Sequence, residues 1–212
     1  MYINLKNFLN EKNLKIKGVV HIGAHKGEEL KVYRSLKIKN IILYEANDKL
    51  IKNLRIKKFF YKFFYKTNIE IINKAVSESL NCIDLNITSN SQSSSILDLK
   101  DHKKLYPQIK KIETKKVQST TLNEDFSTQF NICHYNMLNM DIQGAELLVL
   151  KGSSSILPFL DLIYTEINFA EMYKDCAMAD ELDKFLSEYG FYRAITKTPE
   201  SDLWGDAIYI KK

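Results

Sequence analysis

Three carboxylates are the residues of this chain best suited to chemistry. Glu45, Asp141 and Glu166 each stand at the end of a short apolar run with the character of a buried strand. The carboxyl ends of parallel strands line the ligand crevice of an open α/β sheet, so these acids are expected to converge at one edge. A carboxylate there binds ribose hydroxyls, takes a proton from a hydroxyl group or holds a hard cation. Strand-end acids also cap helices or face water, and that structural interpretation stays open.

A glycine turn precedes these acids in the sequence. Gly23 and Gly27 follow a β-branched run, and glycine lets a ligand approach the backbone closely. Glu45 lies 22 residues after Gly23, which suits an acid that binds ribose hydroxyls. The dinucleotide fingerprint requires a middle glycine where this chain has His25. The pattern therefore argues against NAD or FAD and favours a cofactor with a ribose and no phosphates, such as S-adenosylmethionine.

Strands and helices alternate along the first third of the chain. The hydrophobic pattern predicts strands over 17–22, 41–45 and 69–72, and helices over 2–13, 27–37 and 48–60. The alternation after residue 16 implies a parallel, right-handed βαβαβ unit. Residues 1–16 are interpreted as a helical lead-in to this unit.

The remaining residues continue the α/β pattern around a polar, serine-rich loop at 89–95. Strands are expected at 82–87, 115–119, 137–141, 162–166, 191–196 and 206–211, and helices at 144–150 and 179–189. The last two strands are predicted to be antiparallel. Because there is no internal repeat and no long linker, residues 1–212 are interpreted as one domain.

Composition points to a soluble globular protein. The 212 residues are 45% hydrophobic, and no apolar run reaches the roughly 18 residues that span a bilayer. The first residues lack a signal-peptide pattern. Cys82, Cys133 and Cys176 are odd in number and widely spaced, which suggests reduced thiols and a cytoplasmic location.

The net charge of +5 hides a basic first third. Residues 1–70 carry sixteen Lys and Arg against six Asp and Glu, whereas residues 120–212 carry seven against fifteen. Lysines that solvate helix faces explain this imbalance, although it weakly favours an anionic substrate, the molecule that would accept a transferred group, such as a nucleotide sugar. The aromatic run 61–65 among lysines suggests nucleic-acid stacking or, preferably, an aromatic helix face packed on the sheet. No nucleic-acid partner is expected.

Four segments, in order, resemble the successive motifs of the FkbM-type S-adenosylmethionine-dependent methyltransferases. They are VHIGAHKGE at 20–28, YEAN at 44–47, NKAVS at 73–77 and NMDIQGAE at 139–146. Segments 93–97, 117–122, 181–191 and 204–207 also look like parts of that family. The resemblance covers residues 17–211, and the block 141–150 is its most specific piece.

The resemblance implies a Rossmann-like class I methyltransferase fold. Such a fold has a mostly parallel seven-stranded sheet with an antiparallel last strand and helices on both faces. Family members typically methylate hydroxyl groups, often on sugars of glycans or on natural products. The implied activity is an O-methyltransferase with a small-molecule or glycan acceptor. A lipid or secondary-metabolite acceptor, or a non-catalytic binding protein on the same scaffold, are the alternatives.

The same resemblance assigns roles to individual positions. The implied cofactor-binding residues are His21, Gly23, Ala24, His25, Gly27, Glu45, Ala46, Ala75, Val76, Ser77 and Asp141. The implied acceptor-binding residues are Ser94, Ser95, Gln143 and Asn168. Two positions depart from the family. His21 stands where an acid is common, which leaves the ammonium end of the cofactor without an assigned partner. Gln143 replaces a usual glutamate, and no metal is expected.

Methyl transfer from a sulfonium is an in-line displacement with a good leaving group, so much of the enzyme's work is alignment. A sugar hydroxyl is a poor nucleophile and needs a general base to take its proton. Asp141 is the first candidate for this base and Glu166 the second. A role for Asp141 in orienting the cofactor or capping the next helix stays open.

Overall fold

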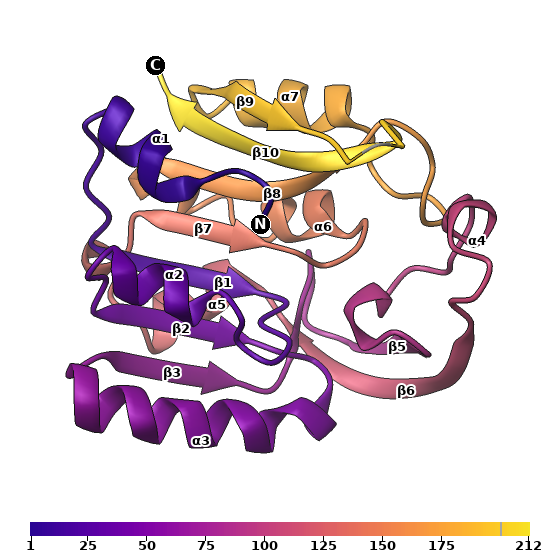
Figure 1. Cartoon of the computed structure of the whole chain (residues 1–212), viewed down its shortest axis with the longest axis horizontal. Coiled ribbons are helices and arrows are strands. Elements are labelled where there is room, and N and C mark those ends of the chain that lie inside the picture. Colours follow the sequence, from indigo (N-terminus) through magenta and orange to yellow (C-terminus); the bar gives the residue numbers. More distant parts are fainter. Residues whose placement is uncertain (200) are drawn as a thin grey trace.

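A seven-stranded sheet forms the centre of the computed structural model, which describes residues 1–199 and 201–212 (Figure 1). The strand order is β3-β2-β1-β7-β8-β10-β9. The strands are β1 (Gly18–Ile22), β2 (Asn40–Tyr44), β3 (Asn68–Ile72), β7 (Met137–Met140), β8 (Leu162–Asn168), β9 (Phe191–Lys197) and β10 (Trp204–Lys211). Strand β10 runs antiparallel to both β8 and β9, while β3, β2, β1, β7 and β8 pair in parallel. The expected mostly parallel sheet with an antiparallel last strand is confirmed.

A smaller sheet stands beyond the carboxyl ends of β1, β2 and β3 (Figure 1). Its order is β4-β6-β5, and its strands are β4 (Ala75–Val76), β5 (Cys82–Thr88) and β6 (Lys111–Thr120). The short helices η1 (Ser91–Ser93) and α4 (His102–Leu105) accompany it. The strands expected at 82–87 and 115–119 therefore exist, but they cover the edge where the acids converge instead of extending the main sheet.

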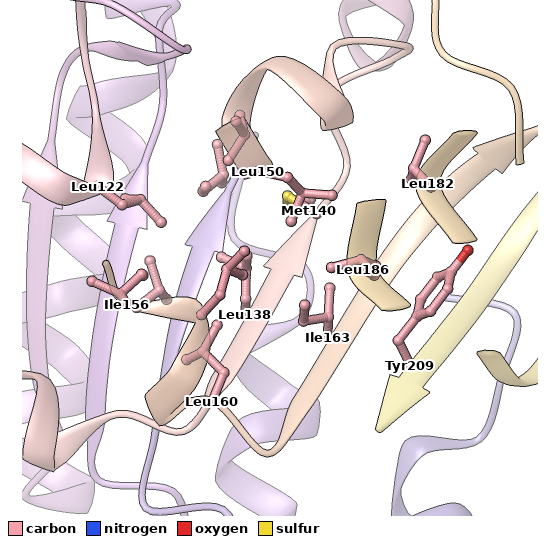
Figure 2. Close-up of a cluster of buried hydrophobic side chains, with 14 of the residues drawn as sticks. Leu122, Leu138, Met140, Leu150, Ile156, Leu160, Ile163, Leu182, Leu186 and Tyr209 are labelled. Carbon is pink, nitrogen blue, oxygen red and sulfur yellow. The ribbon is translucent and has the colours of Figure 1, made fainter. Parts of the chain in front are cut away.

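Helices cover both faces of the large sheet. On one face, α1 (Leu5–Glu11), α2 (Leu30–Ser35) and α3 (Asp48–Tyr65) pack with Val19 and Met137. On the other face, α5 (Leu122–Thr128), α6 (Glu146–Lys151) and α7 (Ala179–Ser187) pack with Val20 and Leu138 (Figure 2). The short helices η2 (Ile132–His134) and η3 (Leu157–Phe159) complete the element list. Adjacent residues of a strand point to opposite faces, which is why Val19 and Val20 belong to different clusters.

Several helices differ in extent from the prediction, and α1, predicted over 2–13, spans only Leu5–Glu11. Helix α2 begins at Leu30 and not at residue 27, because His25 and Gly27 have φ angles of 47° and 72°, outside the right-handed helical region. Helix α3 continues beyond the predicted residue 60 to Tyr65, and Lys66 ends it with a φ of 51°. Within the described ranges, no helix has the length and apolar character that a membrane-spanning helix requires.

The aromatic residues of α3 are not packed as expected. Phe59, Phe60, Phe63 and Phe64 are between 45% and 74% exposed, whereas Tyr61 packs partly against the core. The buried residues of this helix are instead Leu50, Ile51 and Leu54, near its beginning. The prediction that the aromatic face covers the sheet is therefore wrong.

The turn after β1 requires glycine at position 23. Gly23 has a φ of 80°, and a Cβ there would lie 2.0 Å from the backbone oxygen of Asp141. Gly23→Ala is therefore expected to lower the free energy of unfolding by about 2–4 kcal/mol, measured by urea denaturation. Gly190→Ala is the matched control, because Gly190 has a φ of 82° and open space where its Cβ would be. It should cost only about 1 kcal/mol; equal losses in the two variants would show that the collision contributes nothing.

Candidate active site

Two adjoining cavities open at the carboxyl edge of the large sheet. The first lies against the turn after β1, the end of β2 and the small strand β4. The second, of about 490 Å³, lies against α4 and the ends of β7 and β8. Glu29, Gln92 and Asp141 line both cavities, so the two spaces share a wall.

The fold brings most of the predicted site residues to these walls. The first cavity is lined by Gly23, His25, Glu45, Ala46, Ala75, Val76, Ser94, Ser95 and Asp141. The second is lined by Asp141, Gln143 and Glu166 among the predicted residues. They meet because β2, β1, β7 and β8 are parallel neighbours that end at the same edge. Ser94 and Ser95, expected at the acceptor, lie in the first cavity instead.

Four predicted residues lie outside the cavity walls: Ala24, Gly27, Ser77 and Asn168. Ala24 belongs to the hydrophobic core. A Cβ at Gly27 would lie 3.0 Å from Leu30 and 3.1 Å from Leu54, so helix packing explains this glycine. For these four positions the geometry does not support the direct ligand contact that the resemblance implied.

Glu45 is held rigidly at the end of β2. Its Oε2 accepts a hydrogen bond from the His25 backbone N–H and its Oε1 from that of Asn47, both at 2.7 Å. Burial raises the pKa of Glu45, and the two backbone donors oppose that rise. Each carboxylate oxygen retains a second acceptor position. The carboxylate is thus preorganised to accept from a pair of neighbouring hydroxyls such as those of a ribose.

His25 connects the turn after β1 to the loop above it. Its Nδ1 lies 2.9 Å from Glu28 Oε1, and its Nε2 lies 2.7 Å from Ser91 Oγ in η1. The position that is glycine in the dinucleotide fingerprint therefore carries a side chain that reaches the loop 89–95. This arrangement agrees with a cofactor that has no pyrophosphate to bring against the turn.

Gln143 joins the two candidate catalytic carboxylates. Its Nε2 donates to Asp141 Oδ1 at 2.8 Å and to Glu166 Oε2 at 2.9 Å. Its Oε1 accepts from the Tyr173 hydroxyl at 2.5 Å. Because burial raises the pKa of Tyr173, this hydroxyl stays protonated and fixes the amide with its nitrogen toward the acids. Gln143 therefore orients the carboxylates of both Asp141 and Glu166.

The two carboxylates are electrostatically different. Desolvation disfavours the charged form of Asp141 and, with the nearby carboxylates of Asp206 and Glu29, raises its pKa to about 6. The hydrogen bond from Gln143 opposes this rise. Burial, followed by the charge of Asp141, raises the pKa of Glu166 well above its ordinary value. With a pKa of about 6, Asp141 is ionised and able to accept a proton near neutral pH. Within the described residues, no three His, Cys, Asp or Glu side chains are grouped to hold a metal ion.

Gln143→Met should move the acid limb of the pH profile. Gln143 lowers the pKa of Asp141, so its removal raises that pKa. A base must be ionised, and activity falls as the pH drops through its pKa. The limb of kcat/KM, near pH 6 in the wild type, should therefore shift upward by about 0.5–1 pH unit. Gln108→Met, in the same cavity but bonded to neither acid, should leave the limb in place; a variant Gln143→Met with the wild-type profile contradicts the prediction.

Sequence reasoning missed two acids of the site. Glu29 lines both cavities, and Asp206 lines the second. Asp206 lies opposite Glu166 in the antiparallel register of β10 and β8, so correct pairing of the closing strands is the signal that would have found it. Glu29 was placed inside a predicted helix, but it is the N-cap of α2 and directly follows the turn.

His21 is a buried, neutral residue. It is 1% exposed, its ring meets that of Tyr33 edge-on at 5.9 Å, and burial lowers its pKa to about 3. A neutral imidazole does not supply the negative charge that the family's common acid provides. Glu29 lines the same small pocket as His21 and does carry a carboxylate.

The donor set of the first cavity fits S-adenosylmethionine. Glu45 offers a carboxylate for the ribose hydroxyls, and Val76 and Ile142 offer an apolar wall for a flat ring. Glu29 and Asp141 add two carboxylates to this lining, a donor set that suits a cationic sulfonium and ammonium. This strand order, with an antiparallel strand next to last at one end and a cavity at the carboxyl edge, is that of the class I methyltransferase fold.

The chain belongs to the FkbM methyltransferase family. The model of the methyltransferase FkbM domain matches residues 21–192. The cofactor expected for this chain, S-adenosylmethionine, is confirmed by this family membership. No curated protein matches the chain.

Solved methyltransferases share the fold at low sequence identity. Methyltransferase FkbM from Methylobacillus flagellatus KT superposes with a TM-score of 0.61 and 13% identity over 91% of this chain; the match covers 43% of that protein, less than half its length. Magnesium protoporphyrin IX methyltransferase from Synechocystis PCC 6803, solved with bound SAH, superposes with a TM-score of 0.53 and 8% identity. The match covers 98% of this chain and 79% of that one. A putative tRNA (m1A22) methyltransferase of Streptococcus pneumoniae superposes with a TM-score of 0.53 and 9% identity. The match covers 100% of this chain and 71% of that one. Identities this low establish the fold alone.

Proposed function

We propose that this FkbM-family protein methylates a hydroxyl group of an uncharged sugar or glycan. The observation that carries the proposal is the position of Asp141, which lines both the cavity that fits the cofactor and the adjoining second cavity. A base at that junction stands where a methyl group and an acceptor meet. Its raised pKa, about 6, suits proton transfer near neutral pH.

The residues of the first cavity would hold the cofactor. Glu45 binds the ribose hydroxyls, and Ala75 and Val76 border the adenine. Glu29 binds the ammonium end, since His21 is neutral and Glu29 shares its pocket. When bound, the cofactor would supply a methyl group on a cationic sulfur; transfer of that methyl to an acceptor oxygen would form a C–O bond as the C–S bond breaks and the sulfur leaves as a neutral thioether.

Asp141 takes the proton that the acceptor hydroxyl loses. Its Oδ1 accepts a hydrogen bond from Gln143, whereas no described residue donates to Oδ2, so Oδ2 is the freer proton acceptor. Glu166 accepts from the other side of the Gln143 amide, and burial raises its pKa well above its ordinary value. The two acids thus divide the work between proton transfer and alignment.

The lining of the second cavity favours a neutral acceptor. Its carboxylates are Glu29, Asp141, Glu166 and Asp206, and its aromatic residues are Tyr2, Tyr106, Tyr173 and Trp204. Among the residues that the structure describes, no Lys or Arg lines it. Carboxylates repel a phosphate but accept hydrogen bonds from hydroxyl groups, while aromatic rings cover apolar sugar faces. The basic first third therefore does not support an anionic acceptor, because its lysines lie elsewhere.

Methyl transfer from labelled S-adenosylmethionine tests the proposal. The panel pairs each neutral glycoside or glycan with its phosphorylated or nucleotide-linked form. We expect label in the neutral member of a pair and a stable product ether. Binding of S-adenosylhomocysteine, measured as a rise in melting temperature, checks independently that the cofactor site is intact. Transfer only to amines, or only to the anionic members, would overturn the proposed acceptor class.

A further inference from the structure

Helix α3 carries an apolar stripe that the fold does not use. Its members are Ile56, Phe59, Phe60, Phe63 and Phe64, which are 61%, 74%, 45%, 72% and 60% exposed. The spacing i, i+3, i+4, i+7 and i+8 places all five on one helix face. The sheet side is occupied by Leu50, Ile51 and Leu54. Helix α3 therefore has two apolar faces, and the outer one meets solvent.

Basic residues surround this stripe. Residues 49–66 contain seven Lys and Arg and no Asp or Glu. Lys49 pairs with Glu113 and Lys58 pairs with Glu70. The remaining exposed basic residues of this segment form no ion pair with a described residue. The exposed basic residues of this second set are Lys52, Arg55, Lys62 and Lys66. At 100° per residue, Arg55 and Lys62 follow one border of the stripe, and Lys66 directly follows the end of the helix.

The neighbouring elements add to the positive charge. Arg34 Nη1 lies 2.7 Å from the Tyr65 hydroxyl, and its guanidinium stands 4.8 Å from the centre of that ring. Lys39 Nζ donates to the Tyr65 carbonyl at 2.6 Å. The end of α3 is therefore a cationic surface with phenylalanine at its centre.

We propose that this face of α3 docks on an anionic lipid bilayer. Phenylalanine side chains at the centre of a basic surface are the composition of helices that lie in the membrane interface, with the rings at the acyl boundary and the cations among the headgroups. The helix lies along β3, at the end of the sheet opposite β9 (Figure 1). It starts at the carboxyl edge and runs away from it, so docking through residues 56–64 leaves both cavities accessible. The proposal does not depend on the identity of the methyl acceptor.

Two other occupants fit this face less well. A second copy docked through the same helix would bring like charges together without an acid to neutralise them. A single-stranded nucleic acid binds in a cationic groove with separated aromatic platforms. Here the ring centroids of Phe60 and Phe64 lie 4.5 Å apart, and those of the stacked rings of Phe59 and Phe63 lie 6.5 Å apart. The rings therefore already pack against one another along the stripe. A bilayer requires only a continuous apolar face with basic borders.

Vesicle co-sedimentation of the whole chain tests this proposal. We expect binding to vesicles of phosphatidylcholine with phosphatidylglycerol, weak binding to phosphatidylcholine alone, and loss of binding at high salt. The double variant Phe59→Ser/Phe63→Ser should weaken partitioning by at least about tenfold. Lys62→Gln/Lys66→Gln should weaken it by about 10- to 30-fold on anionic vesicles alone.

Matched controls come from other surfaces of the chain. Phe159→Ser, at a residue 58% exposed, and Lys184→Gln on α7 should bind like the wild type. All variants should keep the wild-type melting temperature, because each replaced side chain is exposed. Failure of the wild type to bind anionic vesicles overturns the proposal. So does a dimer, or a complex with single-stranded nucleic acid, that Phe59→Ser/Phe63→Ser abolishes while vesicle binding persists.

Discussion

Asp141→Asn is expected to lower kcat for methyl transfer by about 100- to 10,000-fold, the range that a general base contributes. Asparagine keeps the shape of the side chain, and its Oδ1 still accepts from Gln143, but it cannot take a proton. The wild-type carboxyl has a pKa of about 6 and is ionised above that pH. The residual activity of the variant should therefore also lose the acid limb of the pH profile. Initial rates across pH measure both effects.

Cofactor affinity separates the base from an orienting role, because Asp141 also lines the first cavity. If Asp141 is the base, S-adenosylhomocysteine should bind the variant nearly as it binds the wild type. A loss of affinity as large as the loss of kcat would assign Asp141 to cofactor orientation. Full activity in Asp141→Asn together with its loss in Glu166→Gln would move the base to Glu166. Asp84→Asn, at an exposed acid paired with Lys116, is the control for loss of a negative charge.

Glu45→Gln is expected to weaken S-adenosylhomocysteine binding by about 10- to 100-fold, which is the contribution of one or two hydrogen bonds to a charged acceptor. Each carboxylate oxygen already accepts one backbone N–H and offers its other position to the cavity. Glutamine replaces one of these acceptors by a donor, which then faces one of the two backbone N–H groups, and only one oxygen is left to accept from the ribose hydroxyls. Titration calorimetry gives the affinity, and the ligand-induced rise in melting temperature should shrink accordingly.

The control for this change is Glu113→Gln, an exposed acid that pairs with Lys49 on the surface. It should bind S-adenosylhomocysteine like the wild type. Wild-type affinity in Glu45→Gln would show that the ribose assignment is wrong, even though the protein binds the cofactor. An unliganded Glu45→Gln that melts far below the wild type would mean that the acid mainly supports the turn.

The strands and the acids at their ends follow from local spacing. A buried strand needs a short run of apolar, β-branched residues, and such runs end at Glu45 and Asp141, whereas β8 continues past Glu166 to Asn168. Parallel strands with right-handed crossovers share a carboxyl edge, so convergence of these acids required no knowledge of contacts. His25 in place of a glycine was enough to favour a cofactor without phosphates. These inferences depend on residues close in sequence, which is why they succeeded.

Contacts between distant segments could not be read in this way. The bridge from Gln143 to Asp141 and Glu166 depends on a loop conformation, and the place of Asp206 depends on the pairing of β10 with β8. The stripe of α3 shows the same difference most clearly. A helix with apolar residues on both sides has two equivalent faces in the sequence, and only packing against the sheet selects the buried one. The sequence of the strand ends therefore determines which residues suit the chemistry, whereas tertiary packing decides the shape of the acceptor cavity and the exposure of the phenylalanines.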